Sequence, residues 1–150
     1  MFRVLTALML VMITGLSQTR AADPSLRDPA SLTDEGNQYF TGKGAAQDDA
    51  RAVELYQQAA DMGYARAMHN LGFMYAEGRG VGQDEVKALD FYRAALEQSY
   101  LPAATSLGIA YADGRGVTRE PRTAAMLLRK AAAGGDKRAK DYLAQANLPP

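Results

Sequence analysis

The sequence has no cysteine and no tryptophan, and His69 is its only histidine. Without cysteine the chain forms no disulfide bond and offers no thiolate to a metal or to nucleophilic catalysis. A single histidine cannot supply the histidine pair of a common zinc site. The Gly-x-Ser-x-Gly motif, which presents a serine nucleophile in many hydrolases, is also absent. These absences predict a protein that is not an enzyme and that uses no metal and no cofactor.

Long hydrophobic runs are limited to one uncharged stretch, Val4–Leu16, near the N-terminus. Its 13 residues fall short of the number, about 20, that a helix needs to cross a bilayer. The small residues Thr19 and Ala21 then occupy the positions that precede a cleavage site. This layout favours a secretory signal peptide over residues 1–21 rather than an uncleaved anchor. We therefore expect a periplasmic or secreted protein with no stable membrane anchor after cleavage.

Neither sign of charge dominates, because 17 Lys and Arg balance 17 Asp and Glu. The distribution is uneven: residues 22–113 carry 7 basic and 14 acidic side chains, whereas residues 114–140 carry 8 basic and 2 acidic ones. Nucleic-acid binding would need one coherent basic surface, so we expect no nucleic-acid partner. The basic C-terminal part has two interpretations, a solvated face or a surface for anionic polymers of the cell envelope. Its cations include Arg129, Lys130, Lys137, Arg138 and Lys140.

A shift of 36 residues aligns the chain with itself. Between residues 64–99 and 100–135, 13 of 36 positions are identical without a gap. The glycines and tyrosines that recur in all three copies are Gly36, Gly72 and Gly108; Tyr39, Tyr75 and Tyr111; Gly42, Gly78 and Gly114; and Gly44, Gly80 and Gly116. Self-similarity at this period is typical of solenoids that are built from helix pairs.

Each copy reads as two helices joined by a glycine-rich corner. In the second copy, apolar residues at helical spacing predict a helix over residues 64–77, and Gly78 follows where a left-handed residue closes a helix. Asp84 lies where the next helix needs an N-cap, and we expect that helix to end near Ser99. In the third copy Glu120, followed by a proline, occupies the same cap position.

We therefore expect an all-α fold, a right-handed α/α solenoid of three 36-residue helix-turn-helix repeats plus a C-terminal capping helix. The expected boundaries are a signal peptide over residues 1–21, a linker over 22–27, repeats over about 28–63, 64–99 and 100–135, and a capping helix over 136–147. Three repeats are near the minimum for a stable solenoid, so a partner or self-association is one way to complete its burial.

The recurring residues also predict how the helices pack. Glycine inside a helix costs about 0.5–1 kcal/mol relative to alanine. The three glycines at positions 36, 72 and 108 therefore indicate a close approach of the partner helix, where a side chain would not fit. The tyrosines at positions 39, 75 and 111 are expected to pack in the core, with their hydroxyl groups at its edge.

The "GRG" of the corner, at residues 78–80 and 114–116, has two interpretations, a phosphate-binding loop or a helix corner. A phosphate loop follows a strand and carries a Lys-Ser/Thr pair or a third glycine, and none of these features is present. The helix corner is therefore favoured. The acid pairs at 48–49 and 84–85 likewise favour helix N-termini over paired catalytic carboxylates, because acids there meet the positive end of the helix dipole.

The stretch Ala67–Ser99, with its Leu-Gly, Tyr, Gly-x-Gly-Val and alanine-rich second helix, resembles the Sel1-like repeat family. These repeats are relatives of tetratricopeptide repeats with a longer glycine-bearing corner. The resemblance covers residues 28–146 and implies a helical solenoid that acts as a scaffold for other proteins. Some exported relatives carry a cysteine pair in every repeat and have been linked to penicillin binding. The present chain lacks these cysteines, so the resemblance does not carry that activity over.

The first helices of the three copies vary most at positions outside the predicted core. We expect these positions to form a concave partner-binding face, with Asn37, His69, Asn70, Phe73, Thr105, Ser106 and Ile109 as its contact residues. Exposed apolar residues such as Phe73 and Ile109 cost solubility unless a partner covers them. Amide and hydroxyl groups beside them can order a peptide backbone. His69 aligns with Thr33 and Thr105, which predicts a solvent-facing position for all three.

These features predict a non-catalytic adaptor or scaffold in the bacterial cell envelope. It would bind a segment of another envelope protein, or a peptide, along the concave face of the repeats. Two alternatives stay open at this point. One is an envelope enzyme that acts on cell-wall material or β-lactams, and the other is a binder of anionic envelope polymers through the basic C-terminal face.

Overall fold

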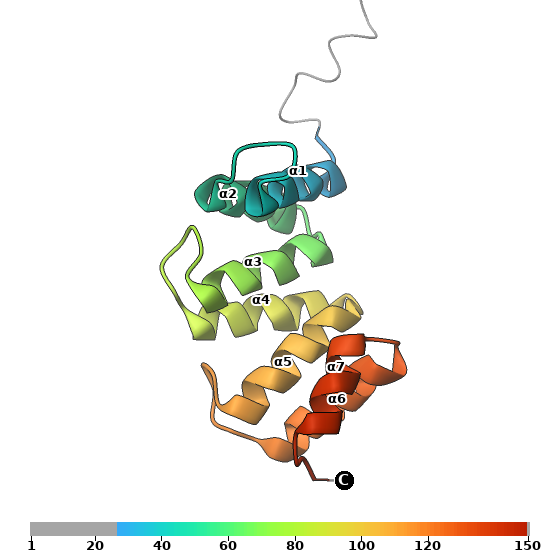
Figure 1. Cartoon of the computed structure of the whole chain (residues 1–150). Coiled ribbons are helices and arrows are strands. Elements are labelled where there is room, and N and C mark those ends of the chain that lie inside the picture. The colour runs from blue at the N-terminus through green and yellow to red at the C-terminus, as the bar shows by residue number, and fades with distance from the viewer. Residues whose placement is uncertain (1–26, 150) are drawn as a thin grey trace, which may run out of the picture.

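The structure, a computed structural model, describes residues 27–149. In this part of the chain there are seven α-helices and no strand (Figure 1). The helices are α1 (Pro29–Thr41), α2 (Asp49–Asp61), α3 (Ala65–Glu77), α4 (Glu85–Glu97), α5 (Leu101–Asp113), α6 (Pro121–Ala133) and α7 (Lys137–Gln145). The expected signal peptide and most of the expected linker lie outside the described residues. Each of these seven helices is too short, or not apolar enough, to cross a membrane.

The helices pack as three hairpin-like pairs that stack on one another. The pairs are α1 with α2, α3 with α4, and α5 with α6, and successive pairs meet where α2 contacts α3 and α4 contacts α5. Helix α7 closes the array against α6, with a smaller contact to α5 (Figure 1). The predicted all-α solenoid with a closing helix is therefore confirmed. Each pair buries one face against the next, so the repeats share a continuous interior.

Aspartate side chains cap four of the seven described helices, α1, α2, α4 and α7. A carboxylate accepts a hydrogen bond from a backbone N–H of the first turn and so satisfies one of the unpaired donors there. The N-cap residues that do this are Asp28, Asp48, Asp84 and Asp136. Glu120 occupies the predicted cap position of α6, but its carboxylate accepts no backbone hydrogen bond, and Thr123 Oγ1 donates to that carboxylate at 2.8 Å instead. The Glu120 side chain, one methylene longer than that of aspartate, thus accepts a hydrogen bond from a side chain instead of from the backbone.

Helices α1, α3 and α5, the first helices of the three repeats, each end immediately before one of the recurring glycines. Gly42, Gly78 and Gly114 are the residues beyond these helices, and each adopts the left-handed conformation. The backbone N–H of each donates to a carbonyl of the last helical turn, as in other left-handed helix ends.

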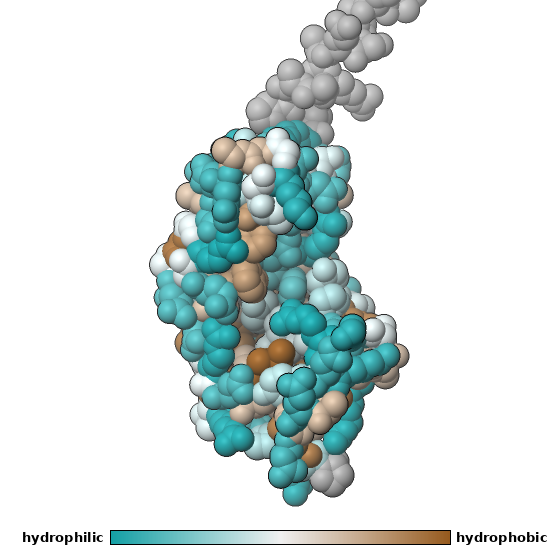
Figure 2. Space-filling view, viewed as in Figure 1, coloured by the Kyte–Doolittle hydropathy of each residue, from teal (hydrophilic) through white to brown (hydrophobic). Residues whose placement is uncertain are grey.

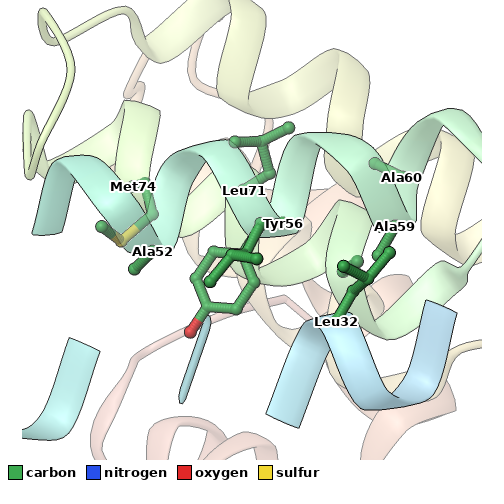
Figure 3. Packing of buried hydrophobic residues seen from close by; sticks show 9 residues of the cluster. Leu32, Ala52, Tyr56, Ala59, Ala60, Leu71 and Met74 are labelled. Carbon is green, nitrogen blue, oxygen red and sulfur yellow. The ribbon is translucent and has the colours of Figure 1, made fainter. Parts of the chain in front are cut away.

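The glycines inside helices make room for side chains of the partner helix. A Cβ atom on Gly36 would lie 2.6 Å from Cε1 of Tyr56, and one on Gly72 would lie 2.7 Å from Cε1 of Tyr92. Figure 3 shows the Tyr56 ring directed from α2 toward α1, inside the first core cluster. The close approach predicted from these glycines is present, but a tyrosine ring, rather than the helix backbone alone, fills the space.

The tyrosines that recur in the first helices, Tyr39, Tyr75 and Tyr111, are half-buried at the edge of the core. Tyr75 packs against both neighbouring core clusters and stacks on Phe91, with ring centroids 5.6 Å apart. Its hydroxyl oxygen accepts a hydrogen bond from Lys87 Nζ at 2.8 Å. This arrangement agrees with the prediction that these rings pack in the core and place their hydroxyl groups at its edge.

The arginine of each "GRG" corner contacts the preceding repeat. The Arg79 guanidinium donates two hydrogen bonds to the Asp49 carboxylate, at 2.9 and 2.7 Å, and lies 4.0 Å from the centre of the Phe40 ring. Arg115 repeats this arrangement one module later by pairing with Glu85 at 3.0 Å. A bidentate pair between arginine and carboxylate fixes geometry as well as charge. The corner arginine is therefore engaged within the protein, which agrees with the helix-corner interpretation.

Candidate functional site

A groove lies on the face formed by the first helices of the second and third repeats and by α7. It encloses about 90 Å³ and is lined by Phe73 on α3, by Ser106 and Ile109 on α5, and by Arg138 on α7. Tyr92, which fills the space above Gly72, forms part of its floor. Figure 2 shows hydrophobic surface within a hollow of this face, flanked by hydrophilic side chains. The structure thus brings three of the predicted contact residues together.

Apolar side chains continue along this face from one repeat to the next. Phe73 is 38% exposed and is one of four large hydrophobic residues that are exposed within residues 27–149. Its ring contacts Phe40 of the preceding repeat edge to face, with centroids 5.8 Å apart. Ile109, one repeat further on, is half-buried. The side chains of Phe40, Phe73 and Ile109 together form an apolar stripe across α1, α3 and α5.

Polar side chains lie beside the apolar stripe and form a second row along the face, here called the polar row. Its members are Asn37, Asn70, His69 and Ser106, and a buried tyrosine supports it. Asn37 Oδ1 accepts hydrogen bonds from Tyr56 Oη at 2.8 Å and from Asn70 Nδ2 at 3.1 Å. Burial raises the pKa of Tyr56 to about 12, so its hydroxyl group stays protonated and remains a donor. His69 Nε2 and Ser106 Oγ lie 3.1 Å apart and form the next hydrogen bond along the face. Tyr56, Asn37 and Asn70 thus form one hydrogen-bond network, which fixes the orientation of the two amide groups.

His69 does not occupy the solvent-facing position expected from the repeat alignment. Its ring packs between Tyr92 and Tyr100, with both centroids 5.4 Å away, and its Nδ1 atom is buried without a hydrogen-bond partner. Burial lowers the pKa of His69 to about 4, and the positive charge of Arg138 acts in the same direction. His69 is therefore a neutral ring that supports the face, and only its Nε2 atom reaches the polar row.

Thr105 cannot contact a partner, because its side chain is fully buried. Its Oγ1 atom donates a hydrogen bond to Asp136 Oδ2 at 2.7 Å. Thr33, at the same position of the first repeat, is also fully buried and donates to the Pro29 carbonyl of its own helix. The prediction of Thr105 as a contact residue, and of a solvent-facing position for it and for Thr33, is wrong. Both threonines point between helices, where a hydroxyl group is tolerated because it finds an acceptor nearby.

The charged side chains of the groove are unevenly paired. At one end, Arg115 forms ion pairs with Glu77 at 3.1 Å and with Glu85 at 3.0 Å. At the other end, Arg138 takes part in none of the ion pairs found among residues 27–149. The groove therefore has a net negative end and a positive end.

Two of the basic residues of the C-terminal part have partners within the described residues. Lys137 pairs with Asp141 on its own helix, and Arg129 donates to the Pro149 carbonyl. Lys130 and Lys140 are exposed, on α6 and α7 respectively. Such pairing weakens the attraction that a basic surface offers to a polyanion.

The repeats match a known family along most of the described chain. Sel1 repeats are found at residues 36–64, 65–100 and 101–136, which together cover more than half of the chain and follow the three helix pairs. The chain belongs to the Sel1 repeat family. Sel1 repeats commonly form scaffolds for protein interaction, and a search of curated proteins returned no match to this chain.

Solved structures of other Sel1 repeat proteins have the same architecture. The Sel1 repeat protein from Oxalobacter formigenes is 33% identical over 81% of this chain, with a TM-score of 0.71. The c5321 protein, a protective antigen present in uropathogenic Escherichia coli strains, is 37% identical over 83% of the chain, with a TM-score of 0.75. The matches span only 49% and 26% of those two chains. Helicobacter pylori cysteine rich protein B shares the fold alone, at 19% identity over 75% of this chain and 87% of its own, with a TM-score of 0.62.

Arg138 and Tyr92 are among the residues of this Sel1 repeat site that the sequence analysis did not include in the contact face. Arg138 reaches the groove from α7, and Tyr92 supplies part of the floor from α4. The repeat register carries a signal for both, because Arg138 aligns with Arg66 of the second copy and Tyr92 aligns with Tyr56 of the first. Both residues lie outside the first helices of the three repeats, to which the predicted contact face is limited.

His69 is expected to make the protein less stable as the pH falls below about 6.5. The unfolded chain binds a proton near pH 6.5, whereas the folded protein binds it only near pH 4. The stabilising contribution of the neutral ring is therefore complete above pH 6.5 and is lost as the pH falls, by roughly 2 kcal/mol at about pH 4.5. Urea denaturation of the wild type and of His69→Gln across this range measures the effect. Identical pH dependence in the two proteins would contradict it, because the substitution removes the histidine and leaves every carboxylate in place.

Proposed function

We propose that this Sel1 repeat protein is a non-catalytic adaptor that binds a segment of another protein along its groove. The observation that carries the proposal is the exposed Phe73 ring beside Ile109, in a hollow whose rim is polar. Apolar anchors within a polar rim are the usual composition of a protein–protein contact. The family supports this reading, since Sel1 repeats commonly scaffold protein complexes.

The polar row beside the apolar stripe suits an extended peptide backbone. Asn37 and Asn70 are held by hydrogen bonds to each other and to Tyr56, so a partner does not have to order them on binding. Asn37 Nδ2 makes no hydrogen bond within residues 27–149 and is free to donate to a partner carbonyl. The apolar stripe then selects side chains, while the amides align the main chain.

We place this activity in the bacterial cell envelope, either in the periplasm or outside the cell. The support is the signal-peptide pattern of residues 1–21. The partner is then a segment of another envelope protein. No catalytic role is assigned, because both carboxylates of the groove pair with Arg115 and its one tyrosine, Tyr92, belongs to the packing.

Substitution of the apolar anchors is expected to abolish partner binding without unfolding the protein. Phe73→Glu and Ile109→Glu each place a charge where the partner's apolar side chain would lie, and we expect at least a tenfold loss of captured partner, about 1.4 kcal/mol or more. Affinity capture from envelope extracts, identification of the partner and reconstitution with the purified partner measure this. Val86→Glu is the matched control, because Val86 is 59% exposed on α4 and does not line the groove.

The outcomes separate the adaptor from its alternatives. Equal recovery of partners by all four proteins would contradict docking in the groove. Incubation of the purified protein with peptidoglycan and with a β-lactam reporter tests for an enzyme. Turnover that a single substitution abolishes would replace the adaptor with a catalyst.

A further inference from the structure

Arg66 and Arg138 occupy the same position of the repeat, near the start of α3 and of α7. Arg66 forms an ion pair with Asp34, which lies on α1, the first helix of the preceding repeat. The residue of α5 that corresponds to Asp34 is Ser106. The repeat register thus places a carboxylate opposite the first arginine and only a hydroxyl group opposite the second.

Arg138 lacks an acidic partner, although eight ion pairs are present within residues 27–149. It lines the groove together with Ser106, Phe73 and Ile109. Arg138 is exposed, so its guanidinium group attracts a carboxylate with the modest strength of a surface ion pair, and the apolar lining beside it supplies the rest of the contact. Arg138 therefore stands in the groove lining as a cation with which no carboxylate of residues 27–149 forms an ion pair.

The helix that carries Arg138 is fixed in place by Thr105, whose predicted role was contact with a partner. Asp136 caps α7 by accepting a hydrogen bond from the Ala139 N–H through Oδ1, and it accepts the Thr105 hydroxyl through Oδ2. Each carboxylate oxygen thus has a hydrogen-bond partner, and Asp136 forms no ion pair with Arg138, although the Arg138 charge acts on the Asp136 carboxyl group. Thr105 acts as a positioning residue that holds the start of α7, and with it Arg138, against α5.

The opposite end of the groove disfavours acids. Glu77 and Glu85 share one cation, Arg115, which leaves that end with a net negative charge. An acidic residue that binds there would be repelled, whereas one that binds at Arg138 would be attracted. The charge pattern consequently gives a bound segment a preferred direction.

We propose that the groove selects partner segments in which one acidic residue lies beside a large apolar residue, on one side only. The apolar side chain packs between Phe73 and Ile109, and the carboxylate pairs with Arg138 as Asp34 pairs with Arg66. The side of the segment that faces Glu77 and Glu85 carries no acid. This inference rests on the proposed docking function and deepens it by naming the chemistry of the partner.

The test uses a phage-displayed library of random decapeptides, panned against the purified wild type and three variants. Peptides selected by the wild type are expected to carry Asp or Glu on one side of a Leu, Ile, Met or Phe anchor. Arg138→Glu is expected to lose that acid, and to select Lys or Arg in its place, while it keeps the apolar anchor. Lys140→Glu makes the same charge change on the same helix, outside the groove lining, and is expected to select like the wild type. Phe73→Glu is expected to lose the peptides altogether.

Each outcome of the panning decides between the two proposals. Apolar peptides that depend on Phe73 but show no acid, or the same acid preference in the Arg138→Glu variant, would overturn this inference alone. A library that yields no peptide dependent on Phe73 would overturn the docking function and this inference with it.

A second experiment supplies the missing carboxylate from within the chain. The wild type is expected to bind a selected peptide about fivefold more tightly than the same peptide with Gln in place of its acid, as measured by fluorescence polarisation. Ser106→Asp restores the pattern of the Asp34 and Arg66 pair, so the two peptides should bind this variant equally. Ser106→Asn, of similar size and without charge, should keep the wild-type ratio. An unchanged ratio in the Ser106→Asp variant would overturn the assignment of Arg138.

Discussion

Replacement of Gly80 by alanine is expected to lower the free energy of unfolding by about 3 kcal/mol. Gly80 has a φ angle of +68°, and a Cβ atom there would lie 2.3 Å from the backbone carbon and oxygen of Asp49, at the start of α2. The left-handed conformation costs a non-glycine residue about 1–2 kcal/mol, and the overlap adds about 1–3 kcal/mol because it is with backbone that cannot rotate away. Relief of the clash moves the corner away from the preceding repeat and breaks the bidentate pair between Arg79 and Asp49.

Two other glycines separate these contributions. Gly63 has a φ angle of +82°, and a Cβ atom added there would meet no other atom within 4 Å, so Gly63→Ala measures the backbone strain alone, about 1 kcal/mol. Gly82 has open space and no left-handed φ, and Gly82→Ala is expected to leave stability nearly unchanged. Urea denaturation followed by circular dichroism at 222 nm compares all three with the wild type. If Gly80→Ala proves no more harmful than Gly63→Ala, the close contact between repeats at the corner is wrong.

The helices and their ends were predictable because the signals for them act over a few residues. An N-cap aspartate such as Asp84 bonds the backbone N–H three residues later, and Gly78 ends its helix by its own conformation. The recurrence of such signals every 36 residues gave the number of helix pairs as well. Sequence therefore predicted the architecture of residues 27–149 closely, including the closing helix.

The direction of polar side chains was less predictable, because it depends on residues about 30 positions away. Arg79 reads as a free corner cation until Asp49 of the previous repeat is placed beside it. Thr105 reads as a surface residue because it is polar, yet the acceptor that permits its burial, Asp136, lies at the start of a different helix. The burial of His69 was unpredictable for the same reason, because the two rings that pack against it, Tyr92 and Tyr100, lie outside its own helix.

The apolar part of the candidate site was predictable and its charged part was not. Phe73 and Ile109 vary from copy to copy at non-core positions of the first helices, and this variation identifies them as candidates. Arg138 reads as one of the basic C-terminal residues, because only the packing of α7 against α5 and α6 brings it to the groove. The contrast between Arg66 and Arg138 becomes informative once the ion pair of the former is seen.

Removal of the Tyr56 ring is expected to have the largest effect of any substitution considered, about 4 kcal/mol for Tyr56→Ala. The side chain is only 2% exposed and fills the space above Gly36, which has no side chain of its own to close the cavity. The third repeat shows a smaller side chain in the same slot, since Leu128 packs above Gly108. Tyr56→Leu is therefore expected to cost less, about 2 kcal/mol.

Tyr56→Phe separates the ring from its hydroxyl group. This variant keeps the packing and removes only the hydrogen bond to Asn37 Oδ1, so we expect a loss of about 1 kcal/mol. The order of the three variants in urea denaturation, with alanine worst and phenylalanine mildest, is the decisive result. If phenylalanine were as damaging as alanine, the hydroxyl network rather than the filled slot would hold the first two repeats together. Because Asn37 still accepts from Asn70 in the Tyr56→Phe variant, the same protein also shows whether a less firmly held amide row weakens peptide binding.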